Sequence, residues 1–181
     1  MKKTDIIEIV KIPEKVQIVI DGNIVKIKGP KGETQKTIGH PKVSMKKEGN
    51  DVKLEMKNPT SYERAIVYAL KSHLNNLIHG SINGYVYTLK VCSGHFPMTA
   101  KVEGEKLVVS NFLGEKIPRR ANVLKGVSVK VQGDQISVEG INLGDVSQTA
   151  ANIEIATRIL NRDRRRFQEG IFITSKAGAP I

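Results

Sequence analysis

The sequence predicts an α+β protein with two similar domains from an internal duplication, each an antiparallel β-sheet packed with one α-helix. Residues 16–29 (VQIVIDGNIVKIKG) align without a gap with residues 127–140 (VSVKVQGDQISVEG), and both alternate apolar and polar residues around a glycine turn. In each half, a stretch with apolar residues at helical spacing follows the hairpin. Because neither the sheet nor the helix can bury its apolar face alone, each is expected to cover the other.

The remaining elements of the first domain follow in chain order. Alternating residues within 43–56 predict a second hairpin. Thr60 and Glu63 match a capping box and predict the start of a helix, which Gly80 is expected to end. The apolar face of this helix is expected to hold Tyr62, Ala65, Ile66, Ala69, Leu70, Leu74, Leu77 and Ile78. The first domain is therefore placed at residues 1–80.

The second domain, residues 81–181, is expected to begin with a strand at 85–91 and a hairpin within 100–109. The repeated hairpin and a second helix follow, with Asp145 or Ser147 as the N-cap. The apolar face of that helix is expected to hold Ala150, Ile153, Ile155, Ala156, Ile159 and Leu160. A basic C-terminal segment completes the domain.

The charge balance indicates a polyanionic partner. The 181 residues carry 29 Lys+Arg against 18 Asp+Glu, a formal net charge of +11. Arg64 is the one arginine of the first half, whereas the second half holds Arg119, Arg120, Arg158, Arg162, Arg164, Arg165 and Arg166. Arginine binds phosphate bidentately and stacks on bases, so its clustering favours a specific nucleic-acid surface in the second domain.

Other features of the sequence exclude several classes of protein. It has no apolar run of the length that a membrane span requires and no secretory pattern, so we expect an intracellular protein without membrane association. Cys92 is the only cysteine, which excludes an internal disulfide and a cysteine metal site. The histidines are scattered without ligand spacing, and no cofactor motif is present. We therefore expect no catalytic residues, no metal, no cofactor and no small-molecule substrate.

Three segments are candidates for a nucleic-acid contact. Residues 162–166 are rich in arginine and are expected at the end of the second helix, where cations also favour the helix dipole; we favour RNA contact over capping. Residues 116–120 end in paired arginines and are expected in a loop, for which a solvated turn is an equal alternative. Residues 93–97 favour a strand end with a buried Phe96 over an RNA contact.

Motifs in order along the whole chain resemble the large-subunit ribosomal protein L6 family. In the first half they are Ile12-Pro13-Glu14, Asp21-Gly22-Asn23 and residues 28–33 (KGPKGE). In the second half they are residues 93–97 (SGHFP), 111–116 (NFLGEK) and 147–153 (SQTAANI). The ending, residues 162–173 (RDRRRFQEGIFI), resembles the archaeal and eukaryotic branch and favours an archaeal member. One departure is Asp163-Arg164, where related chains often have an isoleucine before the arginine.

The resemblance implies binding to large-subunit rRNA near the sarcin–ricin loop and the stalk base, where translation factors dock. It also implies neighbouring ribosomal proteins and nearby translation factors as partners, and a ribosome-bound location in the cytoplasm. Within the family, the second domain makes most of the rRNA contacts. Carried over to this chain, the expected rRNA-binding residues are His95, Phe96, Pro97, Asn111, Phe112, Gly114, Lys116, Arg119, Arg120, Arg158, Arg162, Arg164, Arg165, Arg166 and Lys176.

Two further hypotheses remain open from the charge alone. A free-standing RNA-binding or RNA-chaperone module outside the ribosome would carry the same kind of surface. An enzyme that acts on nucleic acid would need carboxylates that converge on a metal ion, and the sequence offers no identifiable set. The best-supported function is therefore that of a structural constituent of the large ribosomal subunit.

Overall fold

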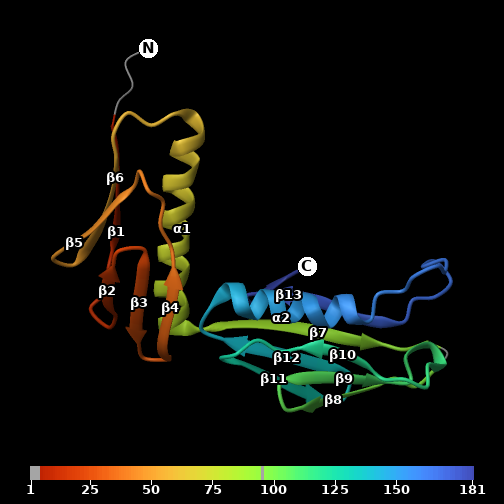
Figure 1. Cartoon of the computed structure of the whole chain (residues 1–181). Helices are drawn as coiled ribbons and strands as arrows, with labels where there is room; N and C mark the ends of the chain where they lie inside the picture. Colours follow the sequence, from red (N-terminus) through yellow and green to blue (C-terminus); the bar gives the residue numbers. More distant parts are fainter. Residues whose placement is uncertain (1–4, 95) are drawn as a thin grey trace. The chain divides into compact units, whose positions relative to one another are not determined.

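The computed structural model describes residues 5–94 and 96–181, which form two compact units that divide between Gly84 and Tyr85 (Figure 1). Each unit combines antiparallel strands with an α-helix, so the predicted α+β class is confirmed. Within the described residues, the strands of each unit divide into two sheets, a detail that the sequence pattern does not resolve.

Unit 1, up to Gly84, holds two three-stranded antiparallel sheets, ordered β1-β6-β5 and β2-β3-β4. Its elements are β1 (Ile6–Lys11), β2 (Gln17–Asp21), β3 (Ile24–Gly29), β4 (Gly32–Thr37), β5 (Ser44–Glu48), β6 (Asp51–Met56) and α1 (Ser61–Asn83). The hairpins predicted within 16–29 and 43–56 are confirmed as β2–β3 and β5–β6. Strand β4 is not predicted because its sequence, GETQKT, lacks the apolar alternation of a half-buried strand.

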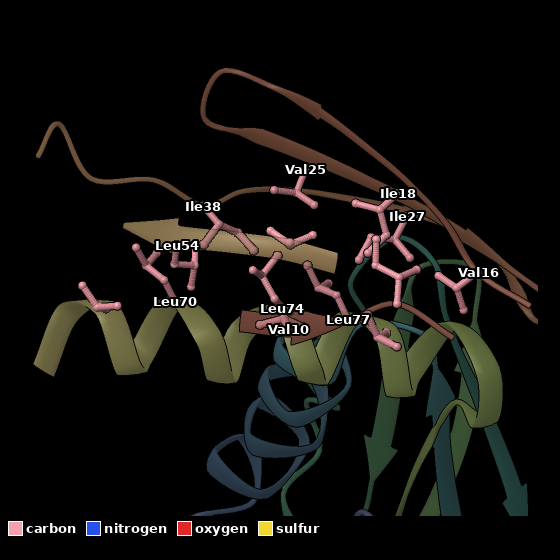
Figure 2. Packing of buried hydrophobic residues seen from close by; sticks show 14 of the residues in the cluster. Val10, Val16, Ile18, Val25, Ile27, Ile38, Leu54, Leu70, Leu74 and Leu77 are labelled. Atoms are coloured by element: carbon pink, nitrogen blue, oxygen red, sulfur yellow. The ribbon is translucent and has the colours of Figure 1, made fainter. Parts of the chain in front are cut away.

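The apolar core of unit 1 lies between α1 and the two sheets. Leu70, Leu74 and Leu77 recur at helical spacing and point toward apolar side chains of the strands, including Ile27 and Leu54 (Figure 2). Leu74, Ile27 and Leu54 are fully buried. Burial of one such side chain stabilises a fold by about 1.5–3 kcal/mol, so this stripe holds the helix against the sheets.

The N-terminal half of α1 differs from the predicted apolar face. Tyr62 is 77% exposed, and Ala65 and Ala69 are also exposed, whereas Val67 is fully buried. Ala65 and Ala69 each lie two residues from Val67, which turns them about 160° away from it around the helix. The buried stripe therefore begins at Val67, and the three predicted core positions Tyr62, Ala65 and Ala69 face solvent.

Helix α1 begins at the predicted capping box. The Thr60 side chain accepts a hydrogen bond from the backbone N–H of Glu63 at 3.3 Å, and the Glu63 carboxylate accepts one from the backbone N–H of Thr60 at 2.7 Å. The Lys42 ammonium donates to the same carboxylate at 2.6 Å. These hydrogen bonds, that of Lys42 foremost, lower the pKa of Glu63 from 4.5 to about 2.

Acid is expected to weaken the fold partly through Glu63. Because its folded pKa is depressed, its contribution is complete above the unfolded value of 4.5 and is lost as the pH falls toward about 2. Between these values, the unfolding free energy of the wild type should fall more steeply than that of Glu63→Gln in urea titrations. Parallel pH profiles would show that the carboxylate adds nothing to the stability of the helix start.

The end of α1 corrects a second prediction. The helix continues through Gly80, which is buried, and runs to Asn83. Gly84 ends it with a φ of 73°, and its N–H donates to the Gly80 carbonyl at 2.9 Å. A positive φ is readily adopted by glycine, so the later of the two glycines ends the helix.

Unit 2, from Tyr85, holds a five-stranded sheet, ordered β11-β12-β7-β13-β14, and a three-stranded sheet, ordered β10-β9-β8. Its elements are β7 (Tyr85–Cys92), β8 (Thr99–Glu103), β9 (Lys106–Ser110), the short 3-10 helix η1 (Phe112–Gly114), β10 (Arg119–Asn122), β11 (Val127–Gln132), β12 (Gln135–Gly140), α2 (Leu143–Ala156), β13 (Gly170–Lys176) and β14 (Ala179–Pro180). The strand and the two hairpins predicted from the sequence are confirmed. Helix α2 packs on strands of both sheets.

Both ends of α2 differ from the prediction. Asn142, not Asp145 or Ser147, is the N-cap, and its side chain accepts from the N–H of Gly144 at 3.0 Å. The helix stops before Thr157, whose hydroxyl donates to the Glu154 carbonyl at 3.3 Å and accepts from the N–H of Ile171 at 2.9 Å. This side chain ties the end of the helix to β13, so residues 157–169 are not helical.

The apolar face of α2 also differs from the prediction. Ile155 is 61% exposed and Leu160 is 68% exposed, whereas Val146 and Thr149 are fully buried in addition to Ala150 and Ile153.

Close packing against a helix explains why Gly29 and Gly140, which end the two repeated hairpins, are glycines. A Cβ on Gly29 would lie 2.7 Å from atoms of Ser81 in α1, and a Cβ on Gly140 would lie 2.7 Å from Val146 in α2. Real Cβ atoms essentially never come so close. The last residue of each repeated hairpin therefore stays glycine because the helix of its unit touches the backbone there.

Gly140→Ala is expected to destabilise unit 2 by about 1–3 kcal/mol, the usual cost of overpacking a filled site. Gly94→Ala is the matched control, because its Cβ would meet Glu169 at an ordinary 3.5 Å. Urea unfolding of the two variants measures the difference. Equal stability of the two variants would mean that α2 shifts freely away from β12.

Candidate nucleic-acid interface

Three segments of unit 2 that are distant in sequence converge at one end of the unit (Figure 1). They are the described residues between β7 and β8 (93–94 and 96–98), the loop at 111–118 between β9 and β10, and the segment 157–169 between α2 and β13. The three predicted contact regions fall in or next to these segments, so the fold brings together what the sequence presents as separate motifs.

Residues 96–97 contact the loop at 111–118 directly. The Asn111 side-chain amide donates to the Pro97 carbonyl at 3.0 Å. The Phe96 ring lies over Gly114, where a Cβ would come within 3.3 Å of it. Phe96 is 44% exposed, so the expectation of a buried phenylalanine is wrong. His95, predicted as a contact, lies outside the described residues.

The loop at 111–118 has a buried base and an exposed tip. Asn111 and Leu113 adopt positive φ values of 59° and 49°, and between them the Phe112 side chain is only 1% exposed. The family resemblance predicts an RNA contact at Phe112, but its burial makes it the anchor of the loop. Lys116 is exposed at the tip, beside Ile117 at 81% exposure.

Arg119 and Arg120 point to opposite faces of the strand on which they lie. Both belong to β10 and not to the predicted loop, and successive side chains of a strand point to opposite faces. The Arg119 guanidinium binds the Glu115 carboxylate at 2.6 and 2.8 Å and lies 4.2 Å from the Phe112 ring centroid. Its hydrogen bonds lower the pKa of Glu115, and the charge of Arg162 acts in the same direction. Arg120 is exposed.

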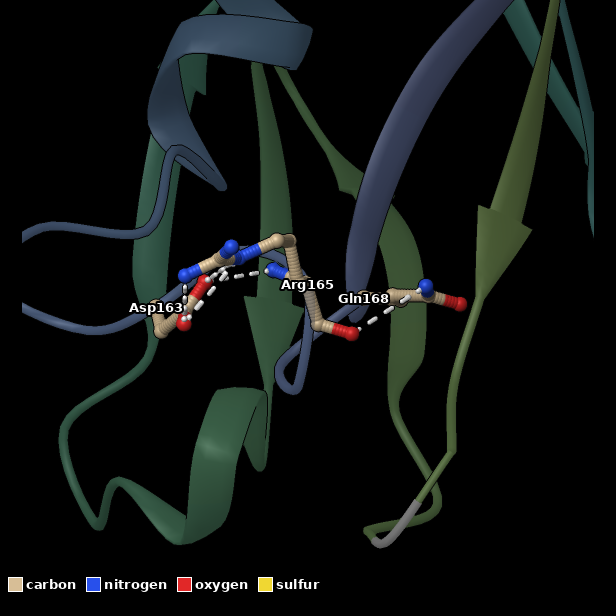
Figure 3. Close-up of polar contacts among 3 residues, drawn as sticks. All are labelled: Asp163, Arg165 and Gln168. Atoms are coloured by element: carbon tan, nitrogen blue, oxygen red, sulfur yellow. Dashed lines mark hydrogen bonds and ion pairs between the residues drawn. The ribbon is translucent and has the colours of Figure 1, made fainter.

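An aspartate organises the 157–169 segment. Asp163 accepts hydrogen bonds from the backbone N–H of Arg165 at 2.9 Å and from its guanidinium at 3.0–3.3 Å, and Gln168 donates to the Arg165 carbonyl at 3.4 Å (Figure 3). These bonds lower the pKa of Asp163. The Arg162 guanidinium lies 5.0 Å from the Phe167 ring centroid. The departure from the family pattern at Asp163 therefore has a structural role that the sequence does not reveal.

The remaining cations of this end form what we call the free cationic set. Its members are Lys116, Arg120, Arg158, Arg164 and Arg166. All five are exposed, and no hydrogen bond or ion pair of their charged groups occurs among the described residues. Exposed cations without such a partner are available to bind phosphate.

A groove of about 870 Å³ opens beside the 157–169 segment. Its lining includes Arg158, Arg164, Arg165, Phe167 and Phe172, together with Glu154 and Glu169. Its volume falls within the usual range of ligand sites, about 300–1,000 Å³. The guanidinium groups of this lining can bind a phosphate, and the aromatic rings can stack on an unstacked base.

Lys176 is not part of this arrangement. It lies at the far end of β13 from Gly170, six residues along the strand, which corresponds to about 20 Å. It is exposed, but the fold does not bring it to the three converging segments.

Ion pairs occur in both units and do not distinguish them. Unit 1 holds Lys42–Glu63 at 2.6 Å, Lys71–Glu8 at 2.7 Å and Lys53–Glu55 at 3.8 Å, and unit 2 holds Arg119–Glu115 at 2.6 Å, Lys130–Glu139 at 3.3 Å and Arg165–Asp163 at 3.0 Å. The clustering of arginine in unit 2 is what makes it the better candidate, because arginine binds phosphate bidentately.

The described part of the chain contains neither a cluster of metal-ligating side chains nor a membrane-spanning helix. Residues 5–94 and 96–181 contain no group of three or more His, Cys, Asp or Glu side chains that could hold a metal ion. Among the same residues, no helix has the length and apolar character of a membrane span.

The comparisons with known proteins agree with the duplicated fold. The family model described as Ribosomal protein L6 matches residues 12–82 and 96–170, one stretch in each unit, which confirms the predicted duplication.

Three similar proteins are each named "Large ribosomal subunit protein uL6". The protein of Aeropyrum pernix is 44% identical over 173 residues, 95% of each chain. That of Saccharolobus solfataricus is 45% identical over 93% of this chain and 94% of its own. That of Methanobrevibacter smithii is 42% identical over 93% of this chain and 95% of its own. This chain therefore belongs to the ribosomal protein L6 family, as a member of its archaeal branch.

Proposed function

We propose that this chain is a structural protein of the large ribosomal subunit and that it binds large-subunit rRNA through the end of unit 2 where the three segments meet. Membership in a family of structural ribosomal proteins makes it a non-enzymatic component. The observation that carries the RNA site is the free cationic set, five exposed cations from the loop at 111–118, strand β10 and the 157–169 segment.

The work of such a surface is binding and positioning. Its cations neutralise phosphates where RNA strands converge, and the salt dependence of binding follows from the counterions that they release. Side chains cannot read the deep major groove of A-form RNA, so shape, phosphate and 2′-hydroxyl contacts carry the recognition. Phe112 is buried beneath the loop at 111–118, and Asp163 is hydrogen-bonded within the 157–169 segment. These contacts hold the cations in place before RNA binds.

We also propose where on the large-subunit rRNA this protein binds. We place it near the sarcin–ricin loop and the stalk base of the large-subunit rRNA, with neighbouring ribosomal proteins and passing translation factors close by. The protein would then be found bound to ribosomes in the cytoplasm. The family resemblance supports this location, and the surface of unit 2 supports a folded RNA as the ligand.

Sedimentation tests the general proposal. In a sucrose gradient at moderate salt, the full chain should sediment with the large subunit and be released as salt rises. A chain that stays at the top of the gradient would instead be a free-standing RNA-binding module.

Chemical probing of large-subunit rRNA tests the location. Adding the protein to rRNA assembled without it should protect nucleotides of the sarcin–ricin loop region and the stalk base. Protections confined to a distant domain of the rRNA would overturn the location but not the binding.

A further inference from the structure

The Arg119 guanidinium is occupied almost completely by its own chain. Its Nε and Nη2 atoms donate to the two Glu115 carboxylate oxygens, and its Nη1 donates to the carbonyls of Ala156 and Arg158 at 3.1 Å each. A guanidinium has five N–H groups, and these contacts use four of them. Arg119 therefore lacks the free fork that bidentate phosphate binding requires.

Its two carbonyl partners lie where α2 ends. The last carbonyls of a helix have no partner within the helix and carry the negative end of its dipole. The last turn of α2 contains no basic residue of its own. A guanidinium from β10, 37 residues before Ala156, supplies both the hydrogen bonds and the positive charge.

These contacts join two RNA-facing segments through one side chain. Glu115 belongs to the loop at 111–118, and the Arg158 carbonyl is where the 157–169 segment leaves the helix. The same segment carries the exposed Arg164 and Arg166 further along the chain. The Phe112 ring also packs against this guanidinium, whose central carbon lies 4.2 Å from the ring centroid.

We propose that Arg119 is a positioning residue, which locks the loop at 111–118 to the 157–169 segment and raises RNA affinity by ordering both before RNA binds. The proposal rests on the proposed RNA-binding function. Preorganisation raises affinity because the entropy of ordering a segment is not lost at the moment of binding. Arg120, exposed on the other face of the same strand, is the residue of the pair that is left to contact RNA.

Amide hydrogen exchange of the protein without RNA provides the first test. Arg119→Lys keeps the charge but cannot span a carboxylate and two carbonyls at once. Both Arg119→Lys and Arg119→Ala should raise exchange in residues 111–118 and 157–169, and Arg120→Ala should not. Glu115→Ala should raise exchange in the same two segments. Wild-type exchange in both segments in Arg119→Lys and Glu115→Ala would overturn the proposal.

Binding to large-subunit rRNA, measured against salt, provides the second test. Arg119→Lys and Arg119→Ala should both lose about three- to tenfold in affinity with the salt slope unchanged. Arg120→Ala should lower the salt slope by about 0.8. Arg119 would instead be a phosphate contact if lysine restored the affinity and alanine lowered the slope. If wild-type protein failed to bind rRNA, the proposed function would fall, and the exchange test would still decide the role of Arg119.

Discussion

Replacing Arg164 and Arg166 together by alanine is expected to weaken binding to large-subunit rRNA about 20-fold at about 0.15 M salt. Removing one phosphate-binding side chain should lower the salt slope by about 0.8, which corresponds to about fivefold in affinity at that salt. Both side chains are exposed, and their guanidinium groups have no ion pair among the described residues. Their removal should therefore leave the thermal melt near that of the wild type.

Lys26→Ala with Lys28→Ala is the matched control for this double variant. It removes the same two positive charges from exposed positions on β3 in unit 1. We expect the control to change affinity by no more than about twofold, since only long-range attraction is lost. Filter binding across a salt series distinguishes the two variants, and an equal loss in both would attribute RNA binding to net charge instead of to the 157–169 segment.

Phe112→Ala is expected to have the largest effect on stability, a loss of about 3–5 kcal/mol in the free energy of unfolding of unit 2. The ring is 1% exposed and belongs to the core cluster that includes Leu107 and Val109. Its removal leaves a cavity under the loop at 111–118 and takes away the ring that faces Arg119. The variant should therefore lose RNA affinity as well as stability.

Phe96→Ala provides the comparison, because it deletes the same ring from a side chain that is 44% exposed. It should cost less than about 1.5 kcal/mol, since less apolar surface is buried there. Urea unfolding, with amide exchange to report on unit 2, measures both variants. A loss below about 1 kcal/mol for Phe112→Ala would mean that the loop is not anchored by this ring.

The features that were predictable from the sequence are those set by neighbouring residues. The repeated hairpins follow from period-two alternation, and the start of α1 follows from the Thr60 and Glu63 capping box. The end of α2 was not predictable, because it depends on Thr157, whose hydroxyl bonds to a strand that comes later in the chain. Apolar spacing alone therefore predicts a helix that is too long.

The sequence predicts which residue types form the candidate site, but not how they are arranged in space. Clustered arginines indicate a phosphate-binding surface, but not which of them are free to bind phosphate. Whether Arg119 or Arg120 is free depends on which face of β10 lies against the end of α2, a contact between residues 37 positions apart. The spacing of Glu115 and Arg119 hints at an ion pair, but it does not reveal the two carbonyls.

Crosslinking within the purified large subunit tests whether this chain binds rRNA through the three converging segments of unit 2. Ultraviolet irradiation followed by mass spectrometry identifies the peptides of this chain that are crosslinked to rRNA. We predict crosslinks within residues 93–98, 111–120 and 157–169, together on one end of unit 2. Crosslinks confined to unit 1, with these three segments unmodified, would show that the chain binds rRNA through unit 1 instead.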